Sequence, residues 1–461
     1  MLKDPEILII GGGNAGLCSA LAARETTSRR IVVVEVAPKT LRGGNSRHTR
    51  NFRCMHSKPL GHLSEAYDEN EFLEDLLKVT NGKTDLELAK MTIRLSEDCY
   101  KWKLSNGVHF QPSLQGTLSL GRTNAFFLGG GKALLNAYYN RAQSRGIEIL
   151  YNTKAIHLKL SKNKIVQVDL QNEEGIYTIH PKAIIVASGG FEANLEWLVK
   201  AWGPQARNFL VRGTPYNRGE VLRDLLQQGL PSVGDPTQCH AVAIDGNAPK
   251  FDGGIVTRID CVPFSIVVNK EGKRFYDEGE DLWPKRYAIW GRLVANQPDQ
   301  VGYAIIDSRS KGLFMPTVSP PFEADNIEEI ASNFNLPKEE LVRTVETFNK
   351  SCRPGDFKPN ELDHLSTKGL VPKKSNWARP IVKPPFYGYV LRPGVTFTYL
   401  GLKINQNGQV LGKERPVTNL WAAGEIMAGS ILGQGYLAGF GMTIGTVFGR
   451  IAGREAANYV Q

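Results

Sequence analysis

The first residues with a chemical pattern lie close to the amino terminus. They form the pattern G-x-G-x-x-G with its inner residues: Gly11, Gly13, Asn14, Ala15 and Gly16. In this pattern the first glycine makes a tight turn, the second lets a pyrophosphate reach the backbone, and the third lets a helix pack closely on a strand. Glu35 stands nineteen residues after Gly16, where a carboxylate accepts hydrogen bonds from a ribose. This chemistry is dinucleotide binding.

A strand, a helix and a second strand must position these residues. Residues 7–10 are a short apolar run, typical of a buried parallel strand, and residues 17–24 indicate a helix. A second buried strand over residues 31–35 ends in the acid. The helix would present its free N–H groups and its positive dipole end to the phosphates. Because the pattern opens at residue 11 of a long chain, it favours FAD over a free nicotinamide dinucleotide.

A basic loop over residues 41–53 follows the second strand. Four arginines lie within twelve residues around a double glycine: Arg42, Arg47, Arg50 and Arg53. One interpretation is a loop beside the flavin that meets phosphate or carboxylate. The alternative is a solvated basic loop, the usual fate of a run of charges.

On these residues, and on Gly44, Asn45 and Ser46 in the loop, the chain resembles the fumarate reductase/succinate dehydrogenase flavoprotein family. Within that family it is most similar to the FAD-dependent tricarballylate dehydrogenases. Asn45 occupies the place where membrane-bound succinate dehydrogenases carry a histidine joined covalently to FAD. The resemblance therefore implies non-covalent FAD, and an α/β fold in which a Rossmann-like FAD-binding domain carries an inserted α+β substrate-capping domain.

The chain is expected to divide into three segments. Residues 1–236 would form the first part of the FAD-binding domain, residues 237–395 the substrate-capping domain, and residues 396–461 the second part of the FAD-binding domain. Beyond residue 236 prolines and aromatic residues become more frequent, and the pattern of buried parallel strands stops.

Further FAD contacts are expected where later strands end. A buried strand over residues 183–187 leads to Ser188 and Gly189, and a strand over residues 420–423 leads to Gly424 and Glu425. The resemblance implies that the first pair contacts the dinucleotide and that Glu425 accepts hydrogen bonds from the ribityl chain. Two more residues complete the predicted cofactor set: Ala155 and Gly439.

The last helix carries glycines at every fourth position, from Gly441 to Gly453, and these share one face. In an apolar segment this spacing would suggest a membrane helix pair, but Arg450 and Arg454 argue against that. We expect instead a helix that packs very close to the flavin sheet. Its positive N-terminal end would face the flavin pyrimidine ring.

The resemblance also implies residues for proton and substrate chemistry. His240 matches a histidine that binds a substrate carboxylate, and Glu278 ends the signature G-x-R-F-x-x-E, which belongs to a proton relay. Arg286 is the expected relay arginine, with Lys285 as its competitor. Arg309, after a buried strand, falls where the family places its catalytic arginine, and its guanidinium would also clamp a carboxylate. The alternative for each charge is a surface ion pair.

The sequence departs from fumarate reductases at two substrate positions. Thr398 lies in the segment that replaces their substrate histidine, and Tyr436 replaces their carboxylate-binding arginine. Both changes remove ionic carboxylate partners, which makes fumarate or succinate doubtful as substrate. The pattern around Tyr436 resembles the tricarballylate dehydrogenases. The resemblance thus implies that His240, Thr398 and Tyr436 hold carboxylates, with Arg47 or Arg50 adding a charge.

Composition excludes several classes of function. The 461 residues carry 22% charged and 41% hydrophobic residues, which excludes a disordered or fibrous chain. The net charge of +10 suits an anionic ligand, but no RNA-binding pattern accompanies it, so no nucleic acid is expected. Six cysteines without a C-x-x-C pair predict neither an iron–sulfur cluster nor another metal in this chain. We expect a cytoplasmic protein, peripheral at the membrane through its electron acceptor.

The resulting hypothesis is an FAD-dependent dehydrogenase that acts on CH–CH groups and oxidises tricarballylate to cis-aconitate. Proton abstraction would accompany hydride transfer to flavin N5, and a separate membrane-bound electron-transfer protein would accept the electrons. Two alternatives stay open. One is a fumarate reductase-like or ketosteroid-type enzyme for another α,β-unsaturated substrate. The other is a flavin electron-transfer subunit without a substrate of its own, which predicts that Arg309→Ala leaves all activity intact.

Overall fold

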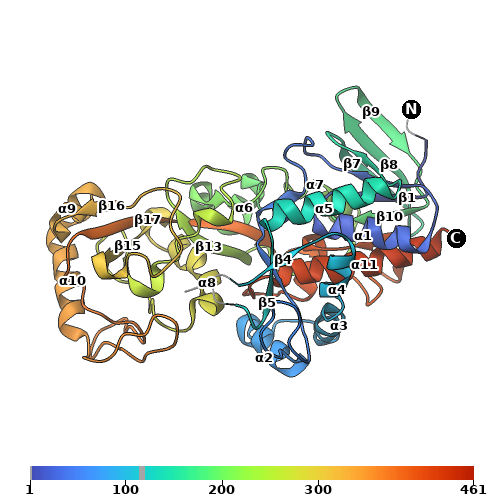
Figure 1. The fold of residues 1–461 in the computed structure, drawn as a ribbon. Coiled ribbons are helices and arrows are strands. Elements are labelled where there is room, and N and C mark those ends of the chain that lie inside the picture. Colours follow the sequence, from blue (N-terminus) through green and yellow to red (C-terminus); the bar gives the residue numbers. More distant parts are fainter. Residues whose placement is uncertain (1–2, 114–119) are drawn as a thin grey trace.

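Two lobes make up the molecule, and the larger one carries the glycine pattern (Figure 1). The computed structural model describes residues 3–113 and 120–461. The larger lobe, at the right of Figure 1, is built on a six-stranded sheet. Its strands in spatial order are β19 (Gln409–Leu411), β20 (Pro416–Ala422), β10 (Ala183–Val186), β1 (Ile7–Ile10), β2 (Ile31–Val34) and β6 (Glu148–Leu150).

This sheet is parallel except at one edge. β20, β10, β1, β2 and β6 run in the same direction, and β19 pairs with β20 antiparallel. β1, β2 and β10 are four-residue aliphatic strands that are buried throughout, as strands covered by helices on both faces must be. The structure confirms the predicted α/β class.

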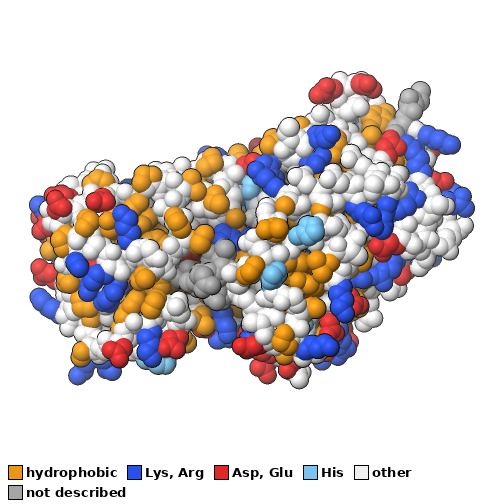
Figure 2. Space-filling model, in the orientation of Figure 1, with side chains coloured by type: hydrophobic (Ala, Val, Ile, Leu, Met, Phe, Trp, Pro, Cys, Tyr) orange, Lys and Arg blue, Asp and Glu red, His pale blue; other side chains and the backbone are white. Residues whose placement is uncertain are grey.

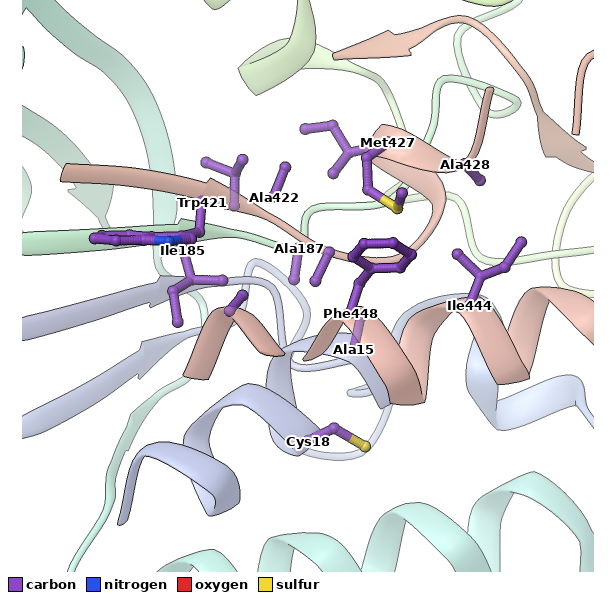
Figure 3. Packing of buried hydrophobic residues seen from close by; sticks show 14 of the residues in the cluster. Ala15, Cys18, Ile185, Ala187, Trp421, Ala422, Met427, Ala428, Ile444 and Phe448 are labelled. Atoms are coloured by element: carbon purple, nitrogen blue, oxygen red, sulfur yellow. The ribbon is translucent and has the colours of Figure 1, made fainter. Parts of the chain in front are cut away.

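Helices α1 (Asn14–Thr26) and α11 (Phe440–Tyr459) pack closely against each other below this sheet (Figures 1 and 3). A Cβ atom added at Gly449 would lie 2.6 Å from the carbonyl oxygen of Ala15, and one at Gly453 would lie 2.2 Å from that of Ser19. Only glycine permits this approach. The close approach predicted from the glycines is therefore made to helix α1, and not to the sheet as expected.

The core of this lobe joins the beginning, middle and end of the chain. Figure 3 shows Cys18 of α1, Ile185 of β10, Trp421 of β20 and Phe448 of α11 in one buried cluster. Because the central strand β1 lies between β10 and β2, the residues that follow it are fixed from both sides. The glycine pattern therefore sits on a rigid base.

Smaller elements surround the large lobe. Helices on its flanks are α2 (Glu69–Thr80), α3 (Leu86–Ser96), α4 (Cys99–Ser105), α5 (Gly130–Ser144), α6 (Leu195–Trp202) and α7 (Glu220–Gln227). Strands β3 (Asn51–Arg53), β4 (Phe110–Gln111) and β5 (Asn124–Phe127) form a small sheet. A second small sheet contains β7 (Lys154–Ser161), β8 (Lys164–Asn172) and β9 (Gly175–Ile179), and β12 (Ser232–Val233) pairs with β18 (Gly401–Leu402).

The smaller lobe, at the left of Figure 1, is organised around the long strand β17 (Phe386–Thr398). Its other strands are β11 (Leu210–Val211), β13 (Cys239–Asp245), β14 (Ile266–Val268), β15 (Gly302–Asp307) and β16 (Phe322–Ala324). Its helices are α8 (Trp283–Ala295), α9 (Ile327–Asn333) and α10 (Lys338–Ser351). We call this lobe the cap.

β17 runs along the cap and ends beside the large lobe, so it joins the two (Figure 1). β11 joins the cap sheet although it precedes residue 237, and β17 crosses residue 395. The predicted division at residues 237–395 remains a prediction. Within residues 3–113 and 120–461, no helix is both long and apolar enough to cross a membrane.

Candidate active site

A continuous cavity runs from the glycine pattern to the base of the cap. Its empty space, including open solvent at the mouth, is about 1730 Å³. One end is lined by backbone of residues 11–15 and by Glu35, and the other by Arg212, His240, Arg258 and Tyr287. The cavity therefore joins an end lined by backbone, which suits a dinucleotide, to an end lined by charged and aromatic side chains.

Glu35 organises the dinucleotide end. Its carboxylate accepts hydrogen bonds from the backbone N–H groups of Gly12 at 3.2 Å, Ala37 at 3.0 Å and Gly43 at 3.2 Å. Burial raises the pKa of Glu35, and these N–H groups oppose the rise. The carboxylate ties the glycine pattern to the basic loop, so both present their backbone to the same ligand.

Fourteen of the fifteen predicted cofactor residues line this cavity. They are Gly11, Gly13, Asn14, Ala15, Glu35, Gly44, Asn45, Ser46, Ala155, Ser188, Gly189, Gly424, Glu425 and Gly439. The exception is Gly16, which faces the strand: a Cβ atom there would lie 1.8 Å from the carbonyl oxygen of Gly11. Helix α11 begins at the cavity, where Gly439 has a φ of 78°. These backbone donors and acceptors fit FAD, and the non-covalent attachment stays a prediction.

Asn45 is held in place by Glu192, which lies beside a second buried carboxyl group, that of Glu425. Its amide nitrogen donates to Glu192 and, at 2.8 Å, to the carbonyl of Thr396. Glu192 also accepts from Asn217 at 2.7 Å, and Glu425 accepts from the backbone of Thr398 at 2.8 Å. Burial raises the pKa of both glutamates, and each affects the other. The pair therefore holds a proton in preference to two negative charges.

This carboxyl pair predicts a pH dependence. A carboxyl group with a raised folded-state pKa stabilises the fold at low pH, and this contribution is lost as pH rises above its ordinary value of about 4.5. Glu192→Gln should therefore reduce the fall in Tm between about pH 5 and pH 8. Thermal unfolding of the apoprotein measured across that range checks the result. An unchanged pH profile would contradict it.

Three arginines meet at the cap end of the cavity. Arg50 comes from the basic loop, Arg212 follows β11, and Arg258 follows β13, and all three line the cavity. Burial, followed by repulsion from Arg258, lowers the pKa of Arg50 and of Arg212 to about 10. All three stay charged at neutral pH, so they concentrate positive charge in a desolvated space.

The three arginines differ in their partners. Arg258 donates to Asp260 at 2.5 Å, and Asp260 also accepts from the indole of Trp283 at 2.6 Å. Burial opposes the charge of Arg258, but Asp260 outweighs that effect and raises the pKa. In the part of the chain that the structure describes, Arg212 has no hydrogen-bond partner for Nε or Nη1, and neither Arg50 nor Arg212 has a carboxylate within 4.0 Å.

Positive and negative side chains are interspersed on the visible face of the molecule. Figure 2 shows Lys and Arg among Asp and Glu over both lobes of the visible face. At the cap end of the cavity, by contrast, the three arginines have one carboxylate partner among the described residues, that of Asp260. Since buried charges are normally paired, this excess indicates an anionic ligand.

His240 lies among the arginines with its ring stacked on Tyr436. The ring centroids are 3.9 Å apart and the planes differ by 8°. Burial and then the charges of Arg212 and Arg258 lower the pKa of His240 well below its usual value. The imidazole is therefore neutral, and its Nδ1 has no hydrogen-bond partner among the described residues. His240 and Tyr436 both lie where the sequence placed them, at the cavity.

The structure does not bring Arg309 to the cavity. On β17, Phe397 pairs with His240 and Phe386 pairs with Asp307, so eleven residues separate the two positions, or roughly 36 Å along the strand. Arg309 donates to Asp307 and to the carbonyl of Pro380. This corrects the expectation that Arg309 contacts the substrate, because the strand that carries it ends at the far side of the cap.

The expected relay residues also lie elsewhere. Glu278 is buried inside the cap and accepts from Arg274 at 2.9 Å and from the backbone of Val267 at 2.8 Å. Arg286 pairs with Glu280. These are ion pairs that hold the cap together, and neither Glu278 nor Arg286 lines the cavity. Lys285, the competing residue, lies 3.8 Å from Asp75.

Thr398 also differs from its expected role. Its hydroxyl bonds Glu425 at 3.2 Å and accepts from the backbone of Phe191 at 3.2 Å, so it supports the carboxyl pair. Two residues earlier on β17, Thr396 lines the cavity, and its hydroxyl has no partner in the described residues. Of the two basic-loop candidates, Arg50 lines the cavity, while Arg47 pairs with Asp252 at 3.5 Å.

Sequence reasoning missed Arg212, Arg258, Tyr287 and Thr396 as cavity residues. Arg258 lies two residues before Asp260. This spacing could have indicated a cavity residue, because a nearby carboxylate can hold a guanidinium group in one orientation. Arg212 and Tyr287 carry no recognisable pattern. Tyr287 lines the cavity because it lies on the buried face of α8, where the guanidinium of Arg258 sits 4.5 Å from its ring centroid.

Comparisons with known proteins agree with this geometry. The sequence profile of the FAD binding domain family matches residues 6–441. The NADH:fumarate oxidoreductase of Klebsiella pneumoniae (strain 342) is 24% identical over 475 residues, which cover 99% of this chain and 48% of the relative. This chain thus spans about half the length of that protein.

Solved structures share the fold. A flavocytochrome c3 fumarate reductase in an open conformation has a TM-score of 0.77 at 21% identity, over 99% of this chain and 79% of its own. The 3-ketosteroid Δ1-dehydrogenase of Sterolibacterium denitrificans has a TM-score of 0.79 at 16% identity, over 99% of this chain and 100% of its own. At these identities the likeness concerns the fold.

Proposed function

We propose that this chain, which belongs to the FAD binding domain family and is an FAD-dependent oxidoreductase, acts on a small polycarboxylate. The proposed reaction is the oxidation of tricarballylate to cis-aconitate. The excess of guanidinium groups at the cap end of the cavity is the observation that supports it. Relatives named as fumarate reductases are consistent with a small carboxylate.

Arg212 and Arg50 would hold two substrate carboxylates. Arg212 is buried and Arg50 is partly buried, and neither is ion-paired in the described part of the chain, so a carboxylate would supply the missing charge. A guanidinium binds a carboxylate through two parallel hydrogen bonds, each contributing about 1.5–3 kcal/mol. The neutral His240 and the hydroxyl of Thr396 would donate further hydrogen bonds. A tricarboxylate uses all of these groups.

Arg258 would transfer the proton that leaves the substrate, which is the role that the sequence predicted for Arg309. Asp260 takes the place of Glu278, because it is buried and bonded to the Arg258 guanidinium. Asp260 and Trp283 fix the orientation of Arg258 beside the cavity. Oxidation of one CH–CH bond releases a hydride and a proton. Arg258, which is already protonated, would take up this proton only as it gives one of its own to the bonded carboxylate of Asp260, so the proton would end on Asp260.

FAD, when bound, supplies the acceptor for the hydride. The residues of the cap hold the substrate and exclude water, because Tyr287, Tyr436 and Phe397 line the same end of the cavity. The electrons must then leave for a partner. The six cysteines include no C-x-x-C pair, so we propose that a separate electron-transfer protein accepts them.

Two alternatives fit less well. A ketosteroid-type substrate requires a large apolar cap end, whereas three arginines line this one. A flavin electron carrier without a substrate has no use for an enclosed, cation-rich space beside its cofactor. A fumarate reductase-like reaction on a smaller dicarboxylate is the nearest competitor.

Anaerobic bleaching of the bound flavin tests the proposal. The panel should include tricarballylate, succinate, a monocarboxylate and a 3-ketosteroid. We expect tricarballylate to bleach the flavin fastest, because it alone offers three carboxylates to the arginine cluster. Rapid bleaching by the monocarboxylate or the steroid, with none by tricarballylate, would refute the proposed substrate while leaving the family unaffected.

A further inference from the structure

Lys103 is an ionisable residue that is buried between helices of the large lobe. It lies on α4 with no exposed surface, where α4 meets α1, α5 and α11. Its Nζ donates to the hydroxyls of Thr446 at 2.9 Å and Tyr138 at 3.1 Å, and lies 3.5 Å from Oδ1 of Asn14. All three partners are neutral oxygens. They satisfy the hydrogen bonds of an ammonium group but not its charge.

No negative charge balances this ammonium group in the described part of the chain. No carboxylate lies within 4.0 Å of Nζ, and the ionisable groups that face it are Cys18 on α1, Cys54 after β3, Cys99 on α4, Tyr138 on α5 and Arg450 on α11. Burial raises the pKa of these thiols, to about 11 for Cys18. They are therefore neutral, and Arg450 adds a like charge. The rings of Phe52, Phe127 and Tyr138 lie 5.0, 5.6 and 5.5 Å from Nζ and favour a cation, but no anion among the described residues balances its charge.

Asn14 connects Lys103 to the dinucleotide end of the cavity. It is the first residue of α1, it lines the cavity, and its backbone N–H donates to Ser46 at 3.0 Å. Its side chain points the other way, toward Lys103 and α11. The ammonium group thus lies directly behind the helix end that faces the phosphates.

We propose that Lys103 is an electrostatic positioning residue for FAD, and that the FAD diphosphate is the counter-charge for its ammonium group, acting across Asn14. The two charges do not touch. They attract through a layer of buried side chain, where charges interact more strongly than in water. This inference needs only FAD and is independent of the proposed substrate.

The proposal predicts that FAD binding takes up a proton. Burial lowers the pKa of Lys103, which favours the neutral amine over the ammonium group in the apoprotein. A nearby diphosphate favours the charged form, which draws a proton from solvent. A lysine that only links four helices would show no such uptake.

The experiment compares apoprotein and holoprotein of three variants. Lys103→Met keeps the length of the side chain and removes its charge, and Lys101→Met is the control, because Lys101 lies on the exposed face of the same helix. Calorimetric FAD titrations in buffers of different ionisation enthalpy count the protons taken up, and flavin fluorescence gives the Kd. Glu192→Gln removes one of the other buried ionisable groups near this cavity, whose protonation a ligand would also perturb.

We expect Lys103→Met to weaken FAD binding about tenfold, to abolish proton uptake, and to leave the Tm of the apoprotein unchanged or higher. Wild-type, Lys101→Met and Glu192→Gln proteins should retain the uptake due to Lys103. Unchanged Kd and proton uptake in Lys103→Met would overturn the proposal. If that variant does not fold, the absence of proton uptake by the Glu192→Gln protein would overturn it equally.

Discussion

Arg212→Met is expected to lower kcat/KM for the polycarboxylate by about 10²–10⁴. The substitution removes two charge-assisted hydrogen bonds, each contributing about 1.5–3 kcal/mol to substrate binding. Arg212 has no carboxylate partner within 4.0 Å in the described structure, so its loss leaves no buried negative charge unpaired. The Tm of the apoprotein should therefore not fall. Stopped-flow reduction of the flavin under anaerobic conditions measures the rate.

Arg309→Met distinguishes this site from the one that sequence reasoning proposed. Arg309 pairs with Asp307 at the far end of β17, so its loss should change kcat/KM by less than about threefold. The two variants together are decisive, because they remove the same charge from different ends of the cap. Full activity in Arg212→Met, with loss of activity in Arg309→Met, would return catalysis to the sequence-based position.

Gly453→Ala is expected to destabilise the protein by about 1–3 kcal/mol and to weaken FAD binding. Alanine gains about 1 kcal/mol in helix propensity over glycine. Its Cβ, however, would lie 2.2 Å from the carbonyl oxygen of Ser19, and this backbone atom cannot move without shifting α1. Since α1 carries the dinucleotide loop at its first turn, the shift reaches the cofactor. Tm and FAD titration measure the two effects.

Gly302→Ala is the matched control. Its Cβ would meet side chains no closer than 3.5 Å, which is ordinary van der Waals contact, and it lies in the cap. We expect a change of less than about 0.5 kcal/mol and no change in FAD affinity. If Gly453→Ala behaved like this control, the contact between α1 and α11 would be looser than the structure indicates.

The sequence was sufficient for the FAD-binding half because its signals are local. The strand over residues 7–10, the glycine pattern and the acid at Glu35 lie within thirty residues, and backbone geometry fixes their relation. The row of glycines on α11 likewise determines one helix face, whatever the tertiary context. Here spacing along the chain translates directly into position.

The substrate end could not be predicted in the same way because it is assembled from distant segments. Arg50, Arg212 and Arg258 come from a loop, a two-residue strand and a helical turn, and no spacing relates them. For Arg309, the preceding strand was predicted correctly but its place in the molecule was not. The buried strand before it was predicted and is observed as β15, but the direction of that strand within the cap depends on its pairing with β17.

Because α1 packs against α11, the dinucleotide loop can become rigid only after the last helix has been synthesised. A nascent chain that has emerged as far as residue 236 contains the dinucleotide loop, yet α1 then lacks the helix that covers one side of it, and β10 lacks its neighbour β20. The loop can be held rigidly only after residues 416–459 have left the ribosome. Rigid cofactor binding therefore requires α11, and a chain truncated before this helix should accumulate without colour.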